Sequence, residues 1–136
     1  MKKLLVITVL VQMLSIISAV AQDKFVGKWT ADDGKEIGFI EFQEEGYAAL
    51  GIGNKVMGGK EFTLRGKKGS MTYVVSDEVL PIKIDLVVTK LESGEQKKLL
   101  CIARFINDNE MLFAMNFNNQ RPIDFTENNA IILKRE

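Results

Sequence analysis

Few side chains in this sequence could do covalent chemistry, because the chain of 136 residues contains no histidine and one cysteine. Ser-His-Asp and Cys-His catalytic arrangements both need an imidazole, so they are excluded. A zinc site is also disfavoured, since histidine and paired cysteines are its usual ligands. Only carboxylates, lysines, tyrosines and serines remain. The sequence therefore predicts no enzyme, no catalytic residue, no metal site and no cofactor.

Charged residues within or beside the predicted strands are the remaining candidates for acid–base chemistry. Two carboxylates at a suitable separation can hydrolyse glycosides. Strand charges usually lie on the solvated face of a sheet, and the sequence does not show that any two of these carboxylates converge. We therefore interpret as surface residues Glu36, Glu41, Asp85, Arg104 and Asp124.

The single cysteine, Cys101, lies in an apolar run from Leu99 to Ile106. It has no partner for an internal disulfide. A thiol nucleophile is normally activated by a neighbouring histidine, which this chain lacks. Cys101 is therefore predicted to be a small buried hydrophobe.

A glycine-rich segment, residues 51–60, has the composition of a phosphate-binding loop. Such a loop needs a strand before it and a helix after it. No helical pattern follows this segment. It is instead predicted to be a mobile loop at the mouth of the fold, of the kind that contacts ligands.

Residues 1–21 have the features of a cleavable secretory signal peptide. Lys2 and Lys3 precede an apolar run, and Ala19-Val20-Ala21 matches the A-x-A cleavage pattern, with Gln22 as the first mature residue. A transmembrane anchor is the alternative, but it needs about 20 apolar residues, and this run is shorter and interrupted. We expect one domain over residues 22–136, exported to the bacterial periplasm or the extracellular space, without stable membrane insertion.

The charges of the mature chain are nearly balanced. The whole chain has 18 basic and 18 acidic residues, and cleavage removes Lys2 and Lys3 but no acidic residue. A chain so close to neutral offers no broad basic surface. Nucleic acid is therefore not an expected partner.

Period-two alternation of apolar residues is the main structural signal in the mature chain. Met71, Tyr73 and Val75 share one face of a predicted strand. Gly and Asn supply turns at short intervals between such runs. Eight or nine strands joined by hairpin-sized turns predict an all-β fold, an antiparallel up-and-down β-barrel of about eight strands, with a sandwich as the alternative. The predicted strands are 25–31, 36–43, 47–52, 61–66, 70–76, 82–90, 98–106, 111–117 and 130–135.

Two of these strands are apolar on both faces, over residues 99–103 and 111–115. In a barrel one face fills the interior and the other meets water, so the second face needs a cover. A short helix, a folded-over loop or a second subunit in a homodimer would each provide that cover.

The mature domain opens with Phe25-Val26-Gly27-Lys28-Trp29, whose Gly-x-Trp resembles the opening motif of the lipocalins. In that family the Trp closes one end of an eight-stranded barrel, and an Arg near the last strand packs across it. The resemblance implies that Gly27, Trp29 and Arg135 close the barrel here, with Arg121 as the second candidate for the arginine. A guanidinium stacks well on an indole ring.

The C-terminal half is similar to small lipocalin-like domains of exported bacterial proteins, which are largely uncharacterised. The matching segments are 81–86, 109–112, 121–125 and 132–135, so the resemblance covers most of residues 25–135. The domain is shorter than a usual lipocalin and shows no helix before its final strand. We therefore expect a barrel that is shallow, partly open or filled.

Methionine and aromatic residues on the predicted strands form the candidate ligand site. Such side chains line adaptable apolar cavities, but they also fill cores, and a barrel of this size can do either. Two functions stay open: an exported binding module for a small apolar ligand, or a structural or protein-interaction domain with a filled barrel. The candidate ligand-binding residues are Trp29, Met57, Phe62, Met71, Tyr73, Met111, Phe113, Met115 and Phe117.

Overall fold

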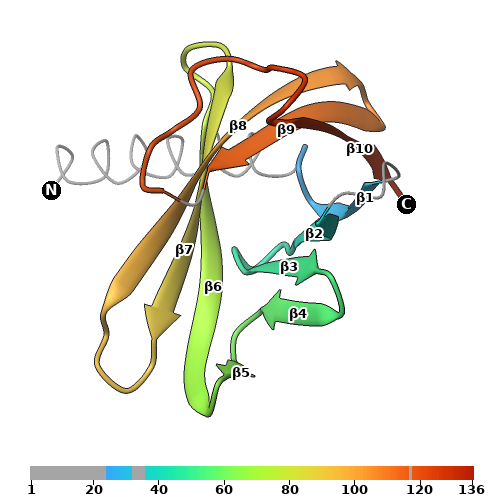
Figure 1. The fold of residues 1–136 in the computed structure, drawn as a ribbon. Helices are drawn as coiled ribbons and strands as arrows, with labels where there is room; N and C mark the ends of the chain where they lie inside the picture. Colours follow the sequence, from blue (N-terminus) through green and yellow to red (C-terminus); the bar gives the residue numbers. More distant parts are fainter. Residues whose placement is uncertain (1–23, 32–35, 117) are drawn as a thin grey trace, which may run out of the picture.

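The computed structural model describes residues 24–31, 36–116 and 118–136. The predicted signal peptide, residues 1–21, and Phe117 lie outside these ranges. Within them the chain forms antiparallel strands (Figure 1), and no helix is long and apolar enough to cross a membrane. The ten strands are β1 (Gly27–Ala31), β2 (Ile37–Phe42), β3 (Ala48–Ile52), β4 (Lys55–Gly58), β5 (Phe62–Leu64), β6 (Lys67–Ser76), β7 (Ile82–Lys90), β8 (Gln96–Asn107), β9 (Glu110–Asn116) and β10 (Ala130–Arg135).

All ten strands belong to one sheet with the order β4-β3-β2-β1-β10-β9-β8-β7-β6-β5. Neighbours along the chain are neighbours in the sheet, except that β1 pairs with β10 and places Trp29 opposite Arg135. This is the predicted all-β meander, an antiparallel and nearly closed barrel with ten strands rather than about eight. The architecture is compatible with a lipocalin-like fold.

The barrel closes through a few backbone contacts to β6, because β4 and β5 are the two edge strands of the sheet. The amide of Met71 donates to the Gly59 carbonyl oxygen at 3.0 Å, and the amide of Tyr73 donates to that of Gly46 at 3.1 Å. Tyr47 and Thr72 form an isolated antiparallel bridge between these two bonds. Closure at this seam is therefore much shorter than an ordinary strand pairing.

The glycine-rich segment 51–60 contains strand β4 where the sequence predicted a mobile loop, and this accounts for the extra strand. Ile52 pairs with Lys55, so Gly53 and Asn54 form a two-residue hairpin loop. Gly53 has a φ of 58°, the conformation that such loops need at their first central position. A Gly-Asn pair between short runs is itself a hairpin signal, so the sequence held the information for β4.

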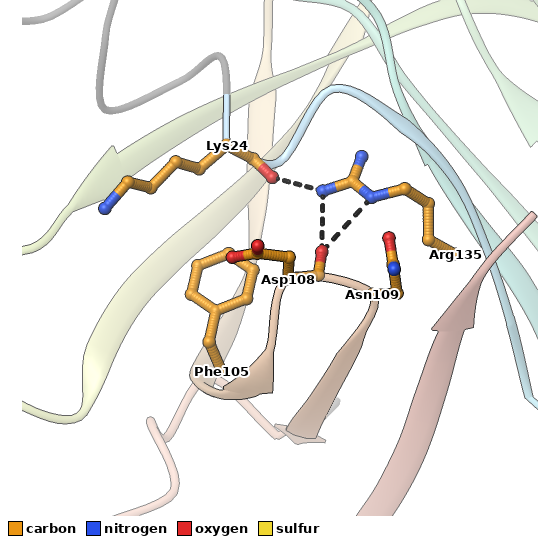
Figure 2. Close-up of a pocket in the computed structure, with 5 residues that line it drawn as sticks. All are labelled: Lys24, Phe105, Asp108, Asn109 and Arg135. Carbon is orange, nitrogen blue, oxygen red and sulfur yellow. Dashed lines mark hydrogen bonds between the residues drawn. The ribbon is translucent and has the colours of Figure 1, made fainter.

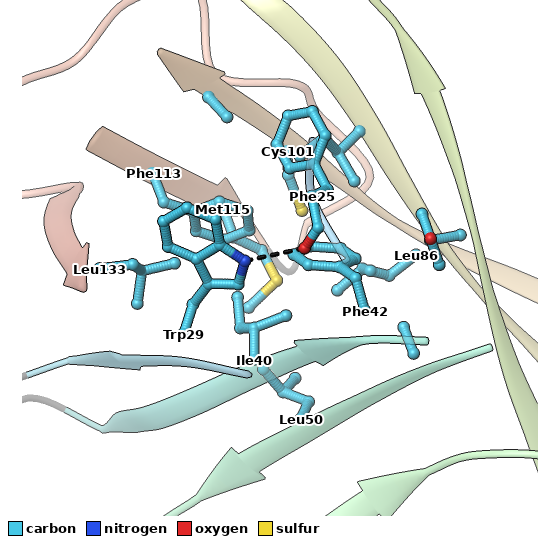
Figure 3. Packing of buried hydrophobic residues seen from close by; sticks show 14 of the residues in the cluster. Phe25, Trp29, Ile40, Phe42, Leu50, Leu86, Cys101, Phe113, Met115 and Leu133 are labelled. Atoms are coloured by element: carbon cyan, nitrogen blue, oxygen red, sulfur yellow. Dashed lines mark hydrogen bonds between the residues drawn. The ribbon is translucent and has the colours of Figure 1, made fainter. Parts of the chain in front are cut away.

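The interior of the barrel is one continuous apolar core (Figure 3). Alternate residues of each long strand point inward, and no polar or charged residue among those described is buried. Figure 3 shows Trp29 among Ile40, Phe113, Met115 and Leu133. Burial of a large apolar side chain stabilises a fold by roughly 1.5–3 kcal/mol, so this core is the main source of stability.

The outer face of β8 and β9 is covered by the segment between β9 and β10. Alternation points Ile102 and Ala114 away from the interior, yet each is only 1% exposed. The Phe125 ring of the covering segment packs with Arg104 of β8 at 5.6 Å. Figure 1 shows this red segment running beside β7 and β8. Of the three covers that the sequence left open, a folded-over loop is the one present here.

Candidate functional site

Aromatic side chains close the end of the barrel where β1 begins. Phe25 is 1% exposed, and its ring centroid lies 5.7 Å from that of Phe42 and 4.9 Å from that of Phe105. Trp29 is fully buried, and its Nε1 donates a hydrogen bond of 2.8 Å to the Phe25 carbonyl oxygen (Figure 3). We call Phe25, Trp29, Phe42 and Phe105 the closed end. No pattern in the sequence indicates this role for the three phenylalanines.

Arg135 lies across the closed end, with its guanidinium carbon 4.2 Å from the Trp29 ring centroid. Gly27 makes room for it, because a Cβ on this residue would lie 2.9 Å from Arg135 Nη1. Gly27 also has a φ of 134°, which side-chain-bearing residues rarely adopt. This is the arrangement that the lipocalin resemblance implies for these three residues.

Hydrogen bonds from Arg135 join three chain segments (Figure 2). Its Nη2 donates to the Lys24 carbonyl oxygen at 2.7 Å, and its Nη1 donates to that of Val26. Nε and Nη2 both lie 3.4 Å from the Asp108 carbonyl oxygen. Most of the donors are therefore used on backbone carbonyls, which makes Arg135 a structural clamp. A hollow of about 390 Å³ beside it is lined by Lys24, Phe105, Asp108, Asn109 and Arg135.

Arg121, the second candidate for the stacking arginine, lies on the outer face of the sheet instead. Its Nη2 is 2.6 Å from Asp85 Oδ1, and the two side chains are 25% and 23% exposed. Its Nη1 donates to the Cys101 carbonyl oxygen at 3.0 Å. A charge-assisted bond between partly buried groups is stronger than an exposed ion pair. Arg121 therefore tethers the covering segment to β7 and β8 and takes no part in closure at Trp29.

Most of the predicted ligand-binding residues lie in a packed interior. A side chain with no exposed surface touches no void large enough for a water molecule. Tyr73 is 3% exposed, and its hydroxyl donates to the Gln43 carbonyl oxygen at 3.1 Å, which fixes it in place. Four of the predicted ligand-binding residues have no exposed surface at all: Trp29, Met71, Met111 and Phe113.

The remaining described candidates, Met57, Phe62 and Met115, lie toward the opposite end. Met115 is 9% exposed, and Met57 and Phe62 are half-buried. Ile52 and Val88 are half-buried as well and pack against the same core. We call Ile52, Met57, Phe62 and Val88 the mouth. Ile52 and Val88 are not among the predicted site residues, although both continue the inward alternation of their strands.

Strand register places the mouth directly beside the packed interior. Met57 is paired with Leu50, and Val88 is paired with Met71. Both partners are fully buried. Each mouth residue of these two pairs therefore lies on the inward face, one strand away from the packed interior. Inward-facing side chains therefore change from fully buried to half-buried between two paired strands.

Strands β5 to β8 extend from the barrel as an arm, which includes Phe62 and Val88 of the mouth. Among the described residues, the pairing of β9 with β8 ends at Leu100, whereas residues 96–99 of β8 stay paired with β7, and β7 with β6 (Figure 1). We call residues 60–70 and 87–98 the arm. These residues include seven basic and three acidic side chains.

The loops around the closed end have the opposite charge. Residues 41–47, 76–81 and 107–110 include seven acidic side chains and no basic one. The antiparallel order brings these three loops to the same end of the barrel, away from the arm. The chain is nearly neutral overall, but its acidic residues are concentrated at the closed end and its basic residues in the arm.

The groups capable of covalent chemistry are few and buried. Cys101 has no exposed surface, and burial raises the pKa of its thiol well above the ordinary value. The thiol is therefore protonated at neutral pH and is a poor nucleophile. In the ranges that the structure describes, no group of three acidic or cysteine side chains is placed to hold a metal ion.

Comparisons of the chain with protein-family models, with curated proteins and with solved structures found no match. The likeness to lipocalins therefore rests on the barrel topology and on the Gly27, Trp29 and Arg135 arrangement.

Proposed function

We propose that this chain is an exported, non-enzymatic binding module that holds a small apolar ligand at the mouth of its barrel. The supporting observation is a difference in burial along one interior surface. Ile40, Phe113 and Leu133 around Trp29 have no exposed surface, whereas the mouth residues are half-buried. An apolar patch left partly open at the edge of a barrel is a surface that a ligand would cover.

The chemistry of the mouth suits a ligand without a fixed shape. Met57 has a flexible, polarizable side chain, and Phe62 offers a flat ring. The fully buried Leu50 is paired with Met57, and the fully buried Met71 is paired with Val88, so both limit how deeply a ligand can enter. We therefore propose a shallow site that is smaller than the set of nine residues predicted from the sequence.

The proposal includes export and excludes a catalytic step. Export rests on the predicted leader and its cleavage after Ala21. N-terminal sequencing of the chain recovered from the periplasm or the medium tests it. A mature start at Gln22 supports export, and a retained leader in the cell body contradicts it.

Titration with N-phenyl-1-naphthylamine, a neutral dye that fluoresces in apolar surroundings, tests the mouth. We expect saturable binding to the mature chain and about tenfold weaker binding to Met57→Ser, because a buried apolar contact of this size is worth more than 1.4 kcal/mol. Val56→Ser is the matched control, since Val56 is the adjacent residue on β4 and is 64% exposed.

Two results would contradict the proposal. One is the absence of saturable dye binding to the mature chain. The other is an equal loss of affinity in Met57→Ser and Val56→Ser, which would indicate dye adsorption on the outer surface. Circular dichroism of each variant verifies that the barrel is intact.

A structural or protein-interaction domain with a filled barrel is the second candidate function. It is favoured by the complete burial of Trp29, Met71, Met111 and Phe113. In this alternative the mouth is covered by a partner, and a homodimer is the simplest case. Light scattering tests it: a dimer that dissociates in Phe62→Ser supports this candidate, and a monomer at all concentrations contradicts the homodimer.

A further inference from the structure

We propose that the ligand of the mouth is a short single-chain amphiphile with an anionic head group, whose tail covers the mouth and whose head group binds the inward-facing lysines of the arm. This inference rests on the proposed function and adds the chemical class of the ligand. The lysines are Lys67, Lys90 and Lys97.

Strand alternation places these lysines on the same surface as the mouth. Directly paired residues of neighbouring strands lie on the same face of a sheet. Val88 of the mouth is paired with Lys97, and Gly69 is paired with Lys90. Lys67 is two residues before the buried Gly69 on β6, so it also points to the inward side.

The change from apolar to basic along the arm occurs over a short distance. Val88 and Lys90 are two residues apart on β7, which corresponds to about 7 Å along a strand. Lysine side chains are long enough to lay their methylene stems on apolar surface and keep the ammonium in water. A head group joined to a tail on Val88 and Phe62 would therefore reach these ammonium groups without a gap.

Two of the arm's three acidic residues, Glu92 and Glu95, lie beside these lysines, and the third, Glu61, pairs with Lys68. Lys90 pairs with Glu95 at 3.3 Å, and both side chains are more than half exposed. Such an exposed pair is worth only about 0.2–1 kcal/mol, so an arriving anion can compete with it. Within the described part of the chain, Lys67 and Lys97 form no ion pair. Near the lysines is a hollow of about 240 Å³ lined by Lys67, Lys68, Lys90, Glu92, Ser93 and Glu95.

The packed interior restricts the tail to one short chain. Met71 and Leu86 adjoin the arm on the barrel side, on β6 and β7, and have no exposed surface. A bulky or double-chain lipid would need a cavity that these two residues fill. A single chain lying across Phe62 and Val88 needs no such cavity.

Competition against the neutral dye tests the inference with two ligands of equal chain length. Dodecanoate carries the anionic head group, and methyl dodecanoate does not. We expect the mature chain to bind dodecanoate about tenfold more tightly, because bonds to charged groups exceed those to neutral ones. This preference should be lost in Lys67→Gln/Lys97→Gln.

The control variant is Lys83→Gln/Lys98→Gln, which removes the same charge from the outward face. Both residues are exposed and adjacent in sequence to inward positions. We expect it to retain the preference for dodecanoate. Equal loss in the two double variants would contradict the inference, because it would indicate general attraction to a basic surface.

The outcomes separate this inference from the proposed function. If dye and both dodecanoyl ligands fail to bind, the proposed function fails. If both ligands bind equally to the mature chain and compete with the dye, the mouth binds apolar ligands but the anionic head-group site is wrong.

Discussion

The two ends of this barrel are built from the same alternating strands but have opposite properties. At the closed end, aromatic rings and the Arg135 guanidinium fill the space, and the surrounding loops are acidic. At the mouth, the apolar side chains are half-buried, and the adjoining arm is basic. An inward position in a strand therefore does not by itself make a residue part of a core. Its burial depends on which strands extend far enough to cover it.

Truncation of Trp29 should have the largest effect on stability. Trp29→Ala removes a fully buried indole and its hydrogen bond to Phe25, so we expect a loss of roughly 3–5 kcal/mol in the free energy of unfolding. Phe62→Ala at the mouth should cost less than about 1.5 kcal/mol, because the ring is already partly exposed. Urea denaturation followed by circular dichroism measures both. Equal costs would remove the distinction between the two ends.

The clamp at Arg135 should have the next largest effect. Arg135→Lys keeps the charge but loses the planar fork that bonds to Lys24, Val26 and Asp108, and we expect a loss of about 1–3 kcal/mol. The exposed neighbour Lys134 serves as the control, since Lys134→Gln should change stability by less than about 0.5 kcal/mol. A lysine at 135 that is fully tolerated would indicate that the stacking and carbonyl bonds contribute little.

Cys101 should give a smaller effect that appears only at alkaline pH. The unfolded chain releases the thiol proton near pH 9, whereas burial raises the native pKa, so stability present below that pH is lost as pH rises. This group alone should cost about 1.4 kcal/mol per pH unit above 9. Urea midpoints at pH 8 to 10 should therefore fall more steeply for the mature chain than for Cys101→Ala. Parallel slopes would contradict burial of the thiol.

Local sequence patterns were sufficient to predict most of the fold. Alternation and turn residues predicted nine of the ten strands, because both act over a few neighbouring residues. The Gly27, Trp29 and Arg135 contact was implied by resemblance and could not be derived from spacing, since its residues lie at opposite ends of the chain. Strand β4 was not predicted although Gly53-Asn54 signals a hairpin, because the many glycines of residues 51–60 are typical of a loop.

The burial difference and the charge separation could not be predicted from the sequence. Both depend on register, namely that β9 ends at Asn116, opposite Leu100, while β6, β7 and β8 continue. Met57 and Met71 have the same side chain, and only the neighbouring strands decide that one is half-buried and the other fully buried. Basic and acidic residues are also equal in number, so the composition gives no sign that one end is acidic and the arm basic.

The most direct test of an open mouth beside a packed interior uses the four methionines that follow the predicted leader, Met57, Met71, Met111 and Met115. Carbon-13 labelling of their methyl groups allows each to be followed by NMR during titration with dodecanoate. We expect Met57 to shift most, Met115 to shift less, and Met71 and Met111 to stay unchanged. Shifts at Met71 and Met111 as large as that at Met57 would contradict the packed interior and indicate a ligand that enters the barrel.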